Sequence, residues 1–149
     1  MSTVKRFEDL VVWQDARHQC QQVFLLMKKE RTKNDFEWRN QISRSSASVM
    51  DNIAEGFEKN NNKEFRNYLY IAKGSCGEVR SQLYRALDRE YLSETEFLEL
   101  NAFCQTLSRK LNAFIAHIDN TTMKGSRYNI NTSKEPEIEY FQKIQEPAY

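Results

Sequence analysis

Ser75 and Glu78 come nearest, by residue type and spacing, to a catalytic pair in this sequence. They lie three positions apart, so on a helix both side chains share one face, where a carboxylate could activate a hydroxyl nucleophile. No histidine lies near them in the sequence, and polar groups at a helix seam more often hydrogen-bond between helices or subunits. We therefore interpret the pair as structural, because a small enzyme that used it would need a solvent-open pocket beside both side chains.

Metal and cofactor motifs are missing from the sequence. Its two histidines, His18 and His117, belong to different predicted helices, and neither has the preceding glutamate that di-iron bundles use. Asp15 shares a face with His18, which indicates an exposed ion pair. The sequence contains no CxxC, HExxH, Walker A or GxGxxG motif, and its glycine-rich segment 74–77 lies inside a periodic helix. We predict no metal, no cofactor and no catalysis.

A line of cationic and aromatic residues on the third predicted helix supports nucleic-acid binding. At about 100° per residue, Arg66, Tyr70, Lys73, Arg80 and Tyr84 fall within about 40° of one line, roughly opposite the apolar stripe. Cations can bind phosphates, and tyrosines can stack on bases. The candidate nucleic-acid-binding residues are Lys63, Arg66, Tyr70, Lys73, Arg80, Tyr84 and Arg85. The alternative is a solvated basic face or a protein–protein surface, which the net charge of only +1 favours.

Apolar residues spaced alternately by three and four predict the helices that position these side chains. The first two helices should span about residues 8–29 and from 34 or 35 to near 56. The third should follow the segment 59–62 and extend at least to 86, and the fourth should span about 93–118. The two prolines both lie beyond residue 135. Asn34, Asn61 and Ser93, each followed three residues later by glutamate, predict helix N-caps. The first three buried stripes are Trp13, Ala16, Cys20, Val23 and Met27; Ile42, Ser46, Val49 and Ile53; and Phe65, Leu69, Ala72, Cys76, Val79, Leu83 and Ala86. The fourth is Phe97, Leu100, Cys104, Leu107, Leu111, Phe114 and Ile118. Short connections between such helices favour an all-α, antiparallel up-down-up-down four-helix bundle.

Small and polar residues in the second and third helices predict a tightly packed seam. Ala47, Met50, Ala54 and Phe57 form a second apolar stripe on helix two, and a helix apolar on two sides usually contacts two neighbours. Gly74 and Gly77 suggest a close approach of another backbone, with a local kink as the alternative. Gly56 suggests a left-handed residue at the helix end, with an extension of the helix over Phe57 and Glu58 as the alternative. The helix-seam and oligomer candidates are Ala47, Met50, Asn52, Ala54, Glu55, Gly56, Gly74, Ser75 and Glu78.

The three cysteines and the C-terminal residues bear on compartment and domain organisation. Cys20, Cys76 and Cys104 are odd in number, far apart in sequence and placed on apolar stripes, which favours reduced core residues in the cytoplasm. No apolar run approaches the roughly 18 residues of a membrane span. We predict a bundle domain over residues 1–118 and an extended or partly disordered polar tail over 119–149, with a short helical turn at 137–144 as the weaker alternative.

Four segments of the sequence are similar to a known family. They are FEDL followed by Trp13 (residues 7–13), Gln41-Ile42-x-Arg44, NIAEG (52–56), and the segment 65–78 with its IA-x-GS-x-x-E pattern. Over about residues 7–118 the chain resembles a family of four-helix-bundle proteins, also labelled ribosomal protein S23-like. Some members are encoded in intervening sequences of bacterial 23S rRNA genes.

The resemblance implies a left-handed antiparallel bundle that assembles as a homopentamer. It also implies kinship with the accessory variability determinant of diversity-generating retroelements, a basic pentameric barrel that binds nucleic acid and the reverse transcriptase. The family supplies no catalytic residues to transfer to this chain. The leading hypothesis is a non-enzymatic oligomeric adaptor in the bacterial cytoplasm that contacts RNA, DNA or a reverse transcriptase complex through its third helix. The alternative is a protein-only assembly module with no nucleic-acid role.

Overall fold

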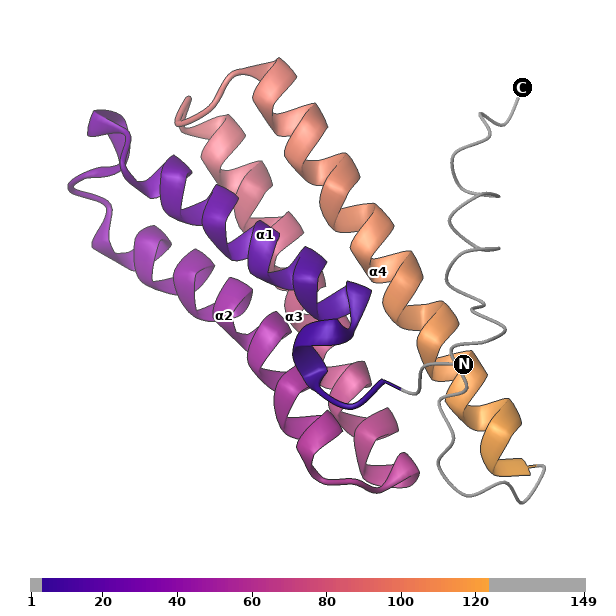
Figure 1. Cartoon of the computed structure of the whole chain (residues 1–149). Coiled ribbons are helices and arrows are strands. Elements are labelled where there is room, and N and C mark those ends of the chain that lie inside the picture. Colours follow the sequence, from indigo (N-terminus) through magenta and orange to yellow (C-terminus); the bar gives the residue numbers. More distant parts are fainter. Residues whose placement is uncertain (1–3, 124–149) are drawn as a thin grey trace, which may run out of the picture.

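Four long helices make up the described part of the chain, residues 4–123 of a computed structural model (Figure 1). Consecutive helices run antiparallel, and no strand occurs in this range, so the predicted all-α four-helix bundle is confirmed. None of the helices in it is long and apolar enough to cross a membrane. The elements are η1 (Phe7–Asp9), α1 (Val11–Met27), η2 (Glu30–Thr32), α2 (Phe36–Glu58), α3 (Asn62–Asp88) and α4 (Glu94–Met123).

The starts of α3 and α4 follow the predicted capping pattern. The Asn61 side chain accepts a hydrogen bond from the backbone N–H of Glu64 at 3.1 Å. Ser93 Oγ accepts one from the backbone N–H of Glu96, also at 3.1 Å. Each cap satisfies a backbone donor that the first helical turn leaves free, and such a cap contributes about 1 kcal/mol.

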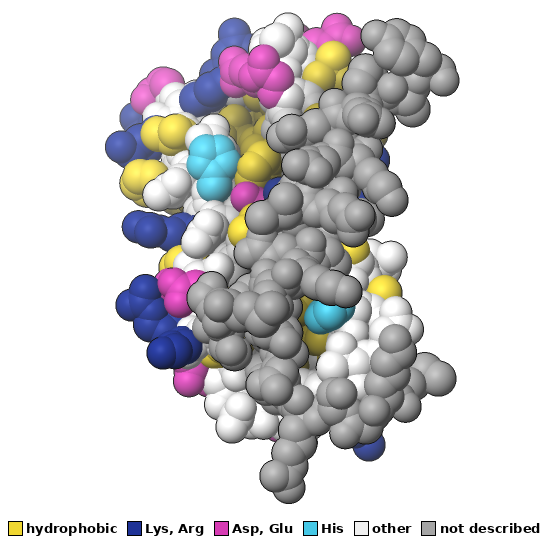
Figure 2. Space-filling view, turned by 45° about the vertical axis from the view of Figure 1, so that its right-hand side comes forward, with side chains coloured by type: hydrophobic (Ala, Val, Ile, Leu, Met, Phe, Trp, Pro, Cys, Tyr) yellow, Lys and Arg dark blue, Asp and Glu magenta, His cyan; other side chains and the backbone are white. Residues whose placement is uncertain are grey.

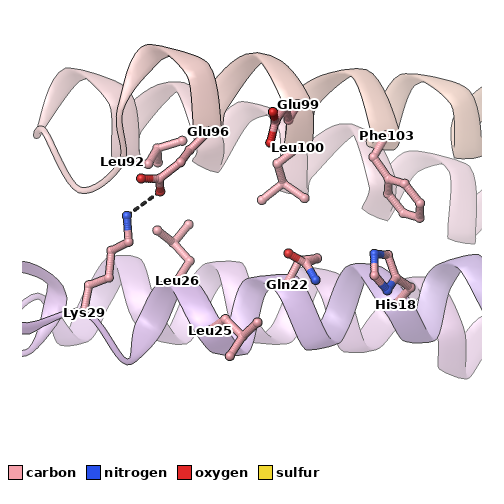
Figure 3. Close-up of a pocket in the computed structure, with 10 residues that line it drawn as sticks. All are labelled: His18, Gln22, Leu25, Leu26, Lys29, Leu92, Glu96, Glu99, Leu100 and Phe103. Carbon is pink, nitrogen blue, oxygen red and sulfur yellow. Dashed lines mark hydrogen bonds and ion pairs between the residues drawn. The ribbon is translucent and has the colours of Figure 1, made fainter.

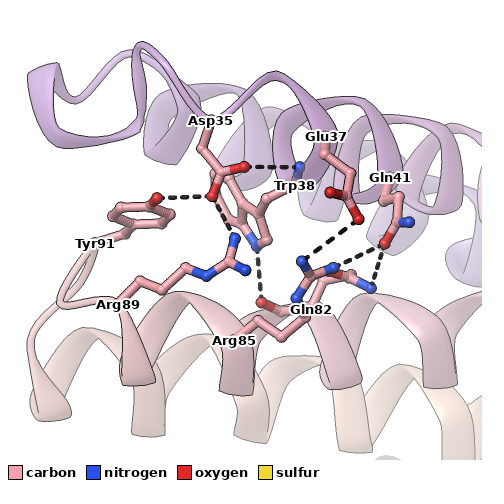
Figure 4. Close-up of polar contacts among 8 residues, drawn as sticks. All are labelled: Asp35, Glu37, Trp38, Gln41, Gln82, Arg85, Arg89 and Tyr91. Carbon is pink, nitrogen blue, oxygen red and sulfur yellow. Dashed lines mark hydrogen bonds and ion pairs between the residues drawn. The ribbon is translucent and has the colours of Figure 1, made fainter.

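The start of α2 differs from the prediction, because Asp35 rather than Asn34 caps it. The Asp35 carboxylate accepts from the backbone N–H of Trp38 at 3.2 Å (Figure 4). It also accepts from Tyr91 Oη at 2.7 Å and forms an ion pair with Arg89. These two partners lie at the far end of α3 and just beyond it, so no local sequence pattern could show that they select Asp35 as the cap.

Gly56 does not end α2, and the alternative prediction, an extension over Phe57 and Glu58, is correct. The helix continues to Glu58, and Asn60 adopts the left-handed backbone conformation, with φ of 52°. Gly56 is buried instead, and a Cβ added to it would lie 2.5 Å from Tyr68 Cβ on α3. Its role is therefore close helix packing, in which the missing side chain lets α3 approach α2.

The last helix is longer than predicted. α4 continues to Met123, so residues 119–123 belong to the bundle rather than to the tail. Asp119 forms an ion pair with Arg66 of α3, which gives this extra turn a tertiary partner. The remaining predicted tail, including the possible turn at 137–144, lies outside the described residues.

The buried stripe of α1 is centred one position away from the predicted one. Ala16 and Val23 are buried as expected, whereas Trp13, Cys20 and Met27 are only half-buried. Val12 and Leu26, which the sequence places beside this stripe as part of a wider apolar face, are buried in the core, and so is Gln19, which the pattern did not predict. The stripes of the other helices are buried as predicted except Leu100, which is half-buried, and the sequence pattern missed Trp38, which is fully buried.

Gln19 can occupy the core because it meets two sulfur atoms there. Its Nε2 lies 3.0 Å from Cys104 Sγ and 3.5 Å from Cys76 Sγ. The Cys76 thiol in turn donates to the backbone carbonyl of Cys104 at 3.3 Å. The hydrogen bond with Cys76 and burial both raise the pKa of Cys104, so its thiol stays protonated. These polar contacts connect α1, α3 and α4 at the centre of the bundle.

Candidate functional site

The seam between α2 and α3 holds an open groove of about 580 Å³, here called the α2–α3 groove. Every residue that lines it is polar or charged. These residues are Asn40, Gln41, Arg44, Ser45 and Ser48 from α2, and Ser75, Glu78, Ser81 and Gln82 from α3. The spacing of three and four places each set on one face of its helix. Four positions that carry the family resemblance, Gln41, Arg44, Ser75 and Glu78, therefore meet in one place.

Hydroxyl and amide groups close the floor of this groove. The Oγ atoms of Ser48 and Ser75 lie 2.8 Å apart and join the two helices. Asn52 Nδ2 donates to the backbone oxygen of Ser48 at 2.7 Å and to its Oγ at 2.9 Å. Ser75 therefore hydrogen-bonds across the seam, whereas Asn52 hydrogen-bonds to Ser48 within α2.

The groove is open, but it does not form a nucleophile–base pair. Ser75 is only 8% exposed and hydrogen-bonds across the seam to Ser48, whereas Glu78 is exposed. Among the described residues, no hydrogen bond joins Ser75 to Glu78, although an activated hydroxyl needs its base within about 3 Å. Within residues 4–123 no group of three or more His, Cys, Asp or Glu side chains could hold a metal ion.

Arg85 belongs to this seam and not to the predicted nucleic-acid line. Its guanidinium donates to Gln41 Oε1 at 2.9 Å and to Gln82 Oε1 at 3.0 Å (Figure 4). Gln82 Nε2 donates to the same Gln41 oxygen at 3.0 Å, and Glu37 lies 3.8 Å from Arg85. Arg85 was a nucleic-acid candidate because it lies near that line in the sequence, and its long side chain extends towards α2, where acceptors are available.

At the other end of the α2–α3 seam, Glu55 and Gly56 hold α3 close. Tyr68 Oη donates to Glu55 Oε1 at 2.9 Å, and this hydrogen bond raises the pKa of Tyr68. The Cβ and Cγ atoms of Tyr68 also pack over Gly56. Glu55 and Gly56 therefore belong to the α2–α3 seam of a single chain.

The predicted cationic and aromatic line on α3 lies beside α4 rather than opposite the core. Arg66 forms an ion pair with Asp119 and stands 5.0 Å from the centre of the Tyr70 ring. Tyr84 packs edge-on against Phe97 of α4, with ring centres 4.8 Å apart. Because α3 packs between α2 and α4, its buried arc is wide, and long side chains at the edge of that arc lie over α4.

Two cations of this line donate to neutral amides. Lys73 Nζ donates to Asn112 Oδ1 at 3.2 Å, and Arg80 Nε donates to Asn101 Oδ1 at 3.3 Å. An amide satisfies a donor without neutralising the charge, so both positive charges remain available. Lys63 is exposed near the start of α3.

The outward surface of α3 carries two glycines that pack against no other helix among residues 4–123. No atom lies within 4 Å of a Cβ added at Gly74 or Gly77. Beside them Ile71 is 52% exposed and Tyr70 is 45% exposed. We call Tyr70, Ile71, Gly74 and Gly77 the α3 outer face. The predicted close approach at Gly74 is absent within one chain.

The second apolar stripe of α2 is partly covered within the chain. Ala47, Met50 and Ala54 are half-buried, and Met50 packs against the core. α2 contacts both α1 and α3, which provides the two neighbours that the pattern required. Contacts within one chain are therefore sufficient to account for the apolar residues of this stripe.

A second groove, of about 350 Å³, separates α1 from α4 (Figure 3). Leu25, Leu100 and Phe103 are among its apolar lining, and the ion pair between Lys29 and Glu96 bridges one end. Exposed hydrophobic side chains also lie in patches between charged ones on the face shown in Figure 2. The sequence analysis missed this groove, although Leu25, which falls outside the predicted stripe, was a usable signal.

The fold and the site define the class of protein: an antiparallel four-helix bundle with a polar inter-helix seam. Residues 8–113 match the 23S rRNA-intervening sequence protein family, so the chain belongs to this family. The chain is also similar in fold to a crystal structure from Bacteroides thetaiotaomicron VPI-5482, described as a protein with unknown function from the S23 ribosomal protein family. The TM-score is 0.64 and the identity 22%, over 70% of this chain and 98% of the other. No curated protein matched the sequence.

Proposed function

We propose that this protein is a non-enzymatic module that assembles with copies of itself through the α3 outer face. The observation that carries the proposal is the pair Gly74 and Gly77. Glycine inside a helix costs about 1 kcal/mol relative to alanine, and the packing of residues 4–123 does not require glycine at either position. A neighbouring copy that packs closely on this face would account for both glycines and bury the exposed Ile71.

The α2–α3 groove beside this face supports the same proposal. Arg44 on α2 and Glu78 on α3 are exposed groove residues of opposite charge. A ring of copies needs a head-to-tail contact between two different surfaces, and exposed groove charges of both signs can each pair with an opposite charge on the neighbouring copy. We propose a homopentamer, the assembly that the family resemblance implies. The free thiols of Cys76 and Cys104 support a reducing, cytoplasmic location.

Light scattering coupled to size-exclusion chromatography tests this proposal. The wild-type particle should have about five times the chain mass of 17.7 kDa. Gly74→Leu should give single chains that keep their helical circular dichroism, because the added side chain has room within one chain but not beneath a neighbour. Ala102→Leu, at an exposed position of α4, is the matched control and should retain the assembly. A single-chain wild type, or a Gly74→Leu particle of unchanged mass, contradicts the proposal.

A second candidate function is nucleic-acid binding along the edge of α3, either directly or as part of a reverse transcriptase complex. It is favoured by the uncompensated charges of Lys73 and Arg80 and by Tyr84, which is 50% exposed. Reversing Arg66, Lys73 and Arg80 together to Glu should weaken RNA retention at about 50 mM salt and leave the particle mass unchanged. RNA retention that the triple reversal does not weaken excludes this surface.

A further inference from the structure

A basic pocket of about 310 Å³ lies where α1 ends and α2 begins, here called the corner pocket. The two helix ends meet at one end of the bundle (Figure 1). Its charged and aromatic lining comprises Phe24, Lys28, Lys29, Glu30, Lys33 and Arg39. It shares no residue with the α3 outer face, the α2–α3 groove or the predicted nucleic-acid line. Its chemistry is therefore separate from that of the proposed assembly.

The corner pocket holds more positive charge than its local partners neutralise. Lys29 pairs with Glu96, and Lys33 Nζ lies 3.1 Å from Glu30 Oε1. With Lys28 and Arg39 included, four cations face two carboxylates, which leaves a net charge of two.

One structural reason for these cations is the C-terminal end of α1. Arg39 Nη1 donates to the Met27 carbonyl at 2.6 Å, which caps that end. A helix C-terminus, however, carries only about half a negative charge. The excess of positive charge is thus larger than helix capping requires, and it is available to a ligand with negative charge.

An exposed aromatic ring lies next to these cations. Phe24 is 54% exposed, and Lys28 Nζ stands 4.9 Å from its ring centre. Phe36 is 75% exposed and precedes Arg39 by three residues on α2, so it lies on the same side of that helix. Flat apolar rings beside cations match the two parts of a nucleotide, because the base stacks while the phosphate pairs with the positive charge.

We propose that the corner pocket binds a nucleotide unit. Lys28, Lys33 and Arg39 hold the phosphate, and Phe24 stacks on the base. A phosphate can displace Glu30 from Lys33, because their ion pair lies at the surface, where ion pairs are weak. The volume is at the small end of ligand pockets and suits one nucleotide at a time. The unit comes either from a free nucleotide or from a single-stranded nucleic acid that passes over the corner.

Binding of a fluorescently labelled, ten-nucleotide single-stranded RNA to the full chain tests this site by anisotropy, with AMP as competitor. Lys28→Glu with Lys33→Glu should weaken RNA binding by about 10-fold or more, and Phe24→Ala should weaken it by about 5-fold or more, as loss of base stacking does. Raising salt from about 50 to 200 mM should weaken wild-type binding about 20-fold if three cations contact phosphates. If AMP displaces the RNA, a free nucleotide is a sufficient ligand. If the RNA binds and AMP does not displace it, the ligand is a nucleic-acid strand. Both outcomes support the site.

The matched control is Arg17→Glu with Arg109→Glu, which changes the charge equally at exposed positions of α1 and α4. It should retain binding within about twofold. Circular dichroism of each variant verifies folding, because Phe24, Lys28 and Lys33 are all exposed. The proposal is overturned if neither RNA nor AMP binds the wild type at about 50 mM salt. It is also overturned if the control pair weakens binding as much as the corner pair, or if Phe24→Ala has no effect. These readouts concern binding alone, so a failed assembly experiment leaves them interpretable.

Discussion

The indole Nε1 of Trp38 donates a hydrogen bond to the backbone carbonyl of Gln82 at 3.0 Å. The bond joins the first turn of α2 to the later part of α3, and the Trp38 ring is fully buried. A large ring in a close-packed site, held by a directional bond, fixes the position of α2 along α3. The alignment of the α2–α3 groove depends on this register.

Trp38→Phe should therefore lower the free energy of unfolding by about 1–3 kcal/mol, because it removes the bond, leaves the Gln82 carbonyl less satisfied and reduces the ring volume. Urea denaturation followed by circular dichroism measures this change. Trp13→Phe is the comparison, since Trp13 is half-buried. Its loss should be clearly smaller, and equal losses would show that Trp38 has no special role.

Gly56 and Gly74 should respond to alanine with opposite signs. Gly56→Ala places a Cβ against Tyr68 and should lower the free energy of unfolding by about 1–3 kcal/mol. Gly74→Ala adds a methyl group in open space and should raise it by about 0.5–1 kcal/mol within a single chain. Denaturation of both variants at a dilution where single chains predominate checks this. The same sign at both positions would contradict the packing described.

Gln19→Met should preserve or raise stability. Among the described residues, the buried Gln19 Oε1 has no hydrogen-bond partner, and such an atom costs about 1–3 kcal/mol. Methionine fills a similar volume without that acceptor, so we expect a gain of up to about 1 kcal/mol in thermal or urea denaturation. Gln19→Ala, which leaves a cavity, should instead be destabilising by about 2 kcal/mol or more. A loss with Met as large as that with Ala would show that the polar contacts to the two cysteines dominate.

Asp35 should make stability depend on pH in the acid range. The hydrogen bond from Tyr91, with those from Trp38 and Arg89, lowers the pKa of Asp35 below its ordinary value of 3.8. A lowered folded-state pKa stabilises the fold above pH 3.8, and the contribution is lost as the pH falls from there through the folded-state pKa.

The measurement is the melting temperature of wild type and Asp35→Asn between about pH 6 and pH 2. The wild type should melt higher at pH 6, and the difference should shrink as the acid range is entered. Asp88→Asn removes an exposed carboxylate as the control. If the difference in melting temperature between wild type and Asp35→Asn stays constant with pH, Asp35 is not the source of the pH dependence of stability.

Local sequence patterns were sufficient for the helices and for two of their caps. Asn61 and Ser93 cap through hydrogen bonds that span three residues, so the sequence itself contains both partners. Asp35 could not be chosen over Asn34 in this way, because Arg89 and Tyr91 are distant in sequence. Likewise, helical periodicity does not reveal that a glutamine amide meets two cysteine sulfurs in the core.

The candidate site was predictable in part. Ser75 and Asn52 were expected at a helix seam; Ser75 hydrogen-bonds across it to Ser48, whereas Asn52 bonds to Ser48 within α2. Gly56 and Gly74 look alike in the sequence, yet one is buried beneath Tyr68 and the other is open. The contacts of Arg85 with Gln41 and Glu37 could not be predicted, because those acceptors lie on another helix, more than forty positions away in the sequence. The corner pocket combines residues of two helices and their connection, which no single periodic pattern groups together.

Because of the groove between α1 and α4, the helices of the bundle should differ in their resistance to unfolding. α1 packs against α4 less extensively than α2 packs against α3, and the bridge at one end of their groove is a surface ion pair. When the chain is pulled from its N-terminus, α1 should peel away first, and its amide protons should exchange with solvent before those of the α2–α3 hairpin. The hairpin would then remain as the last element to come apart.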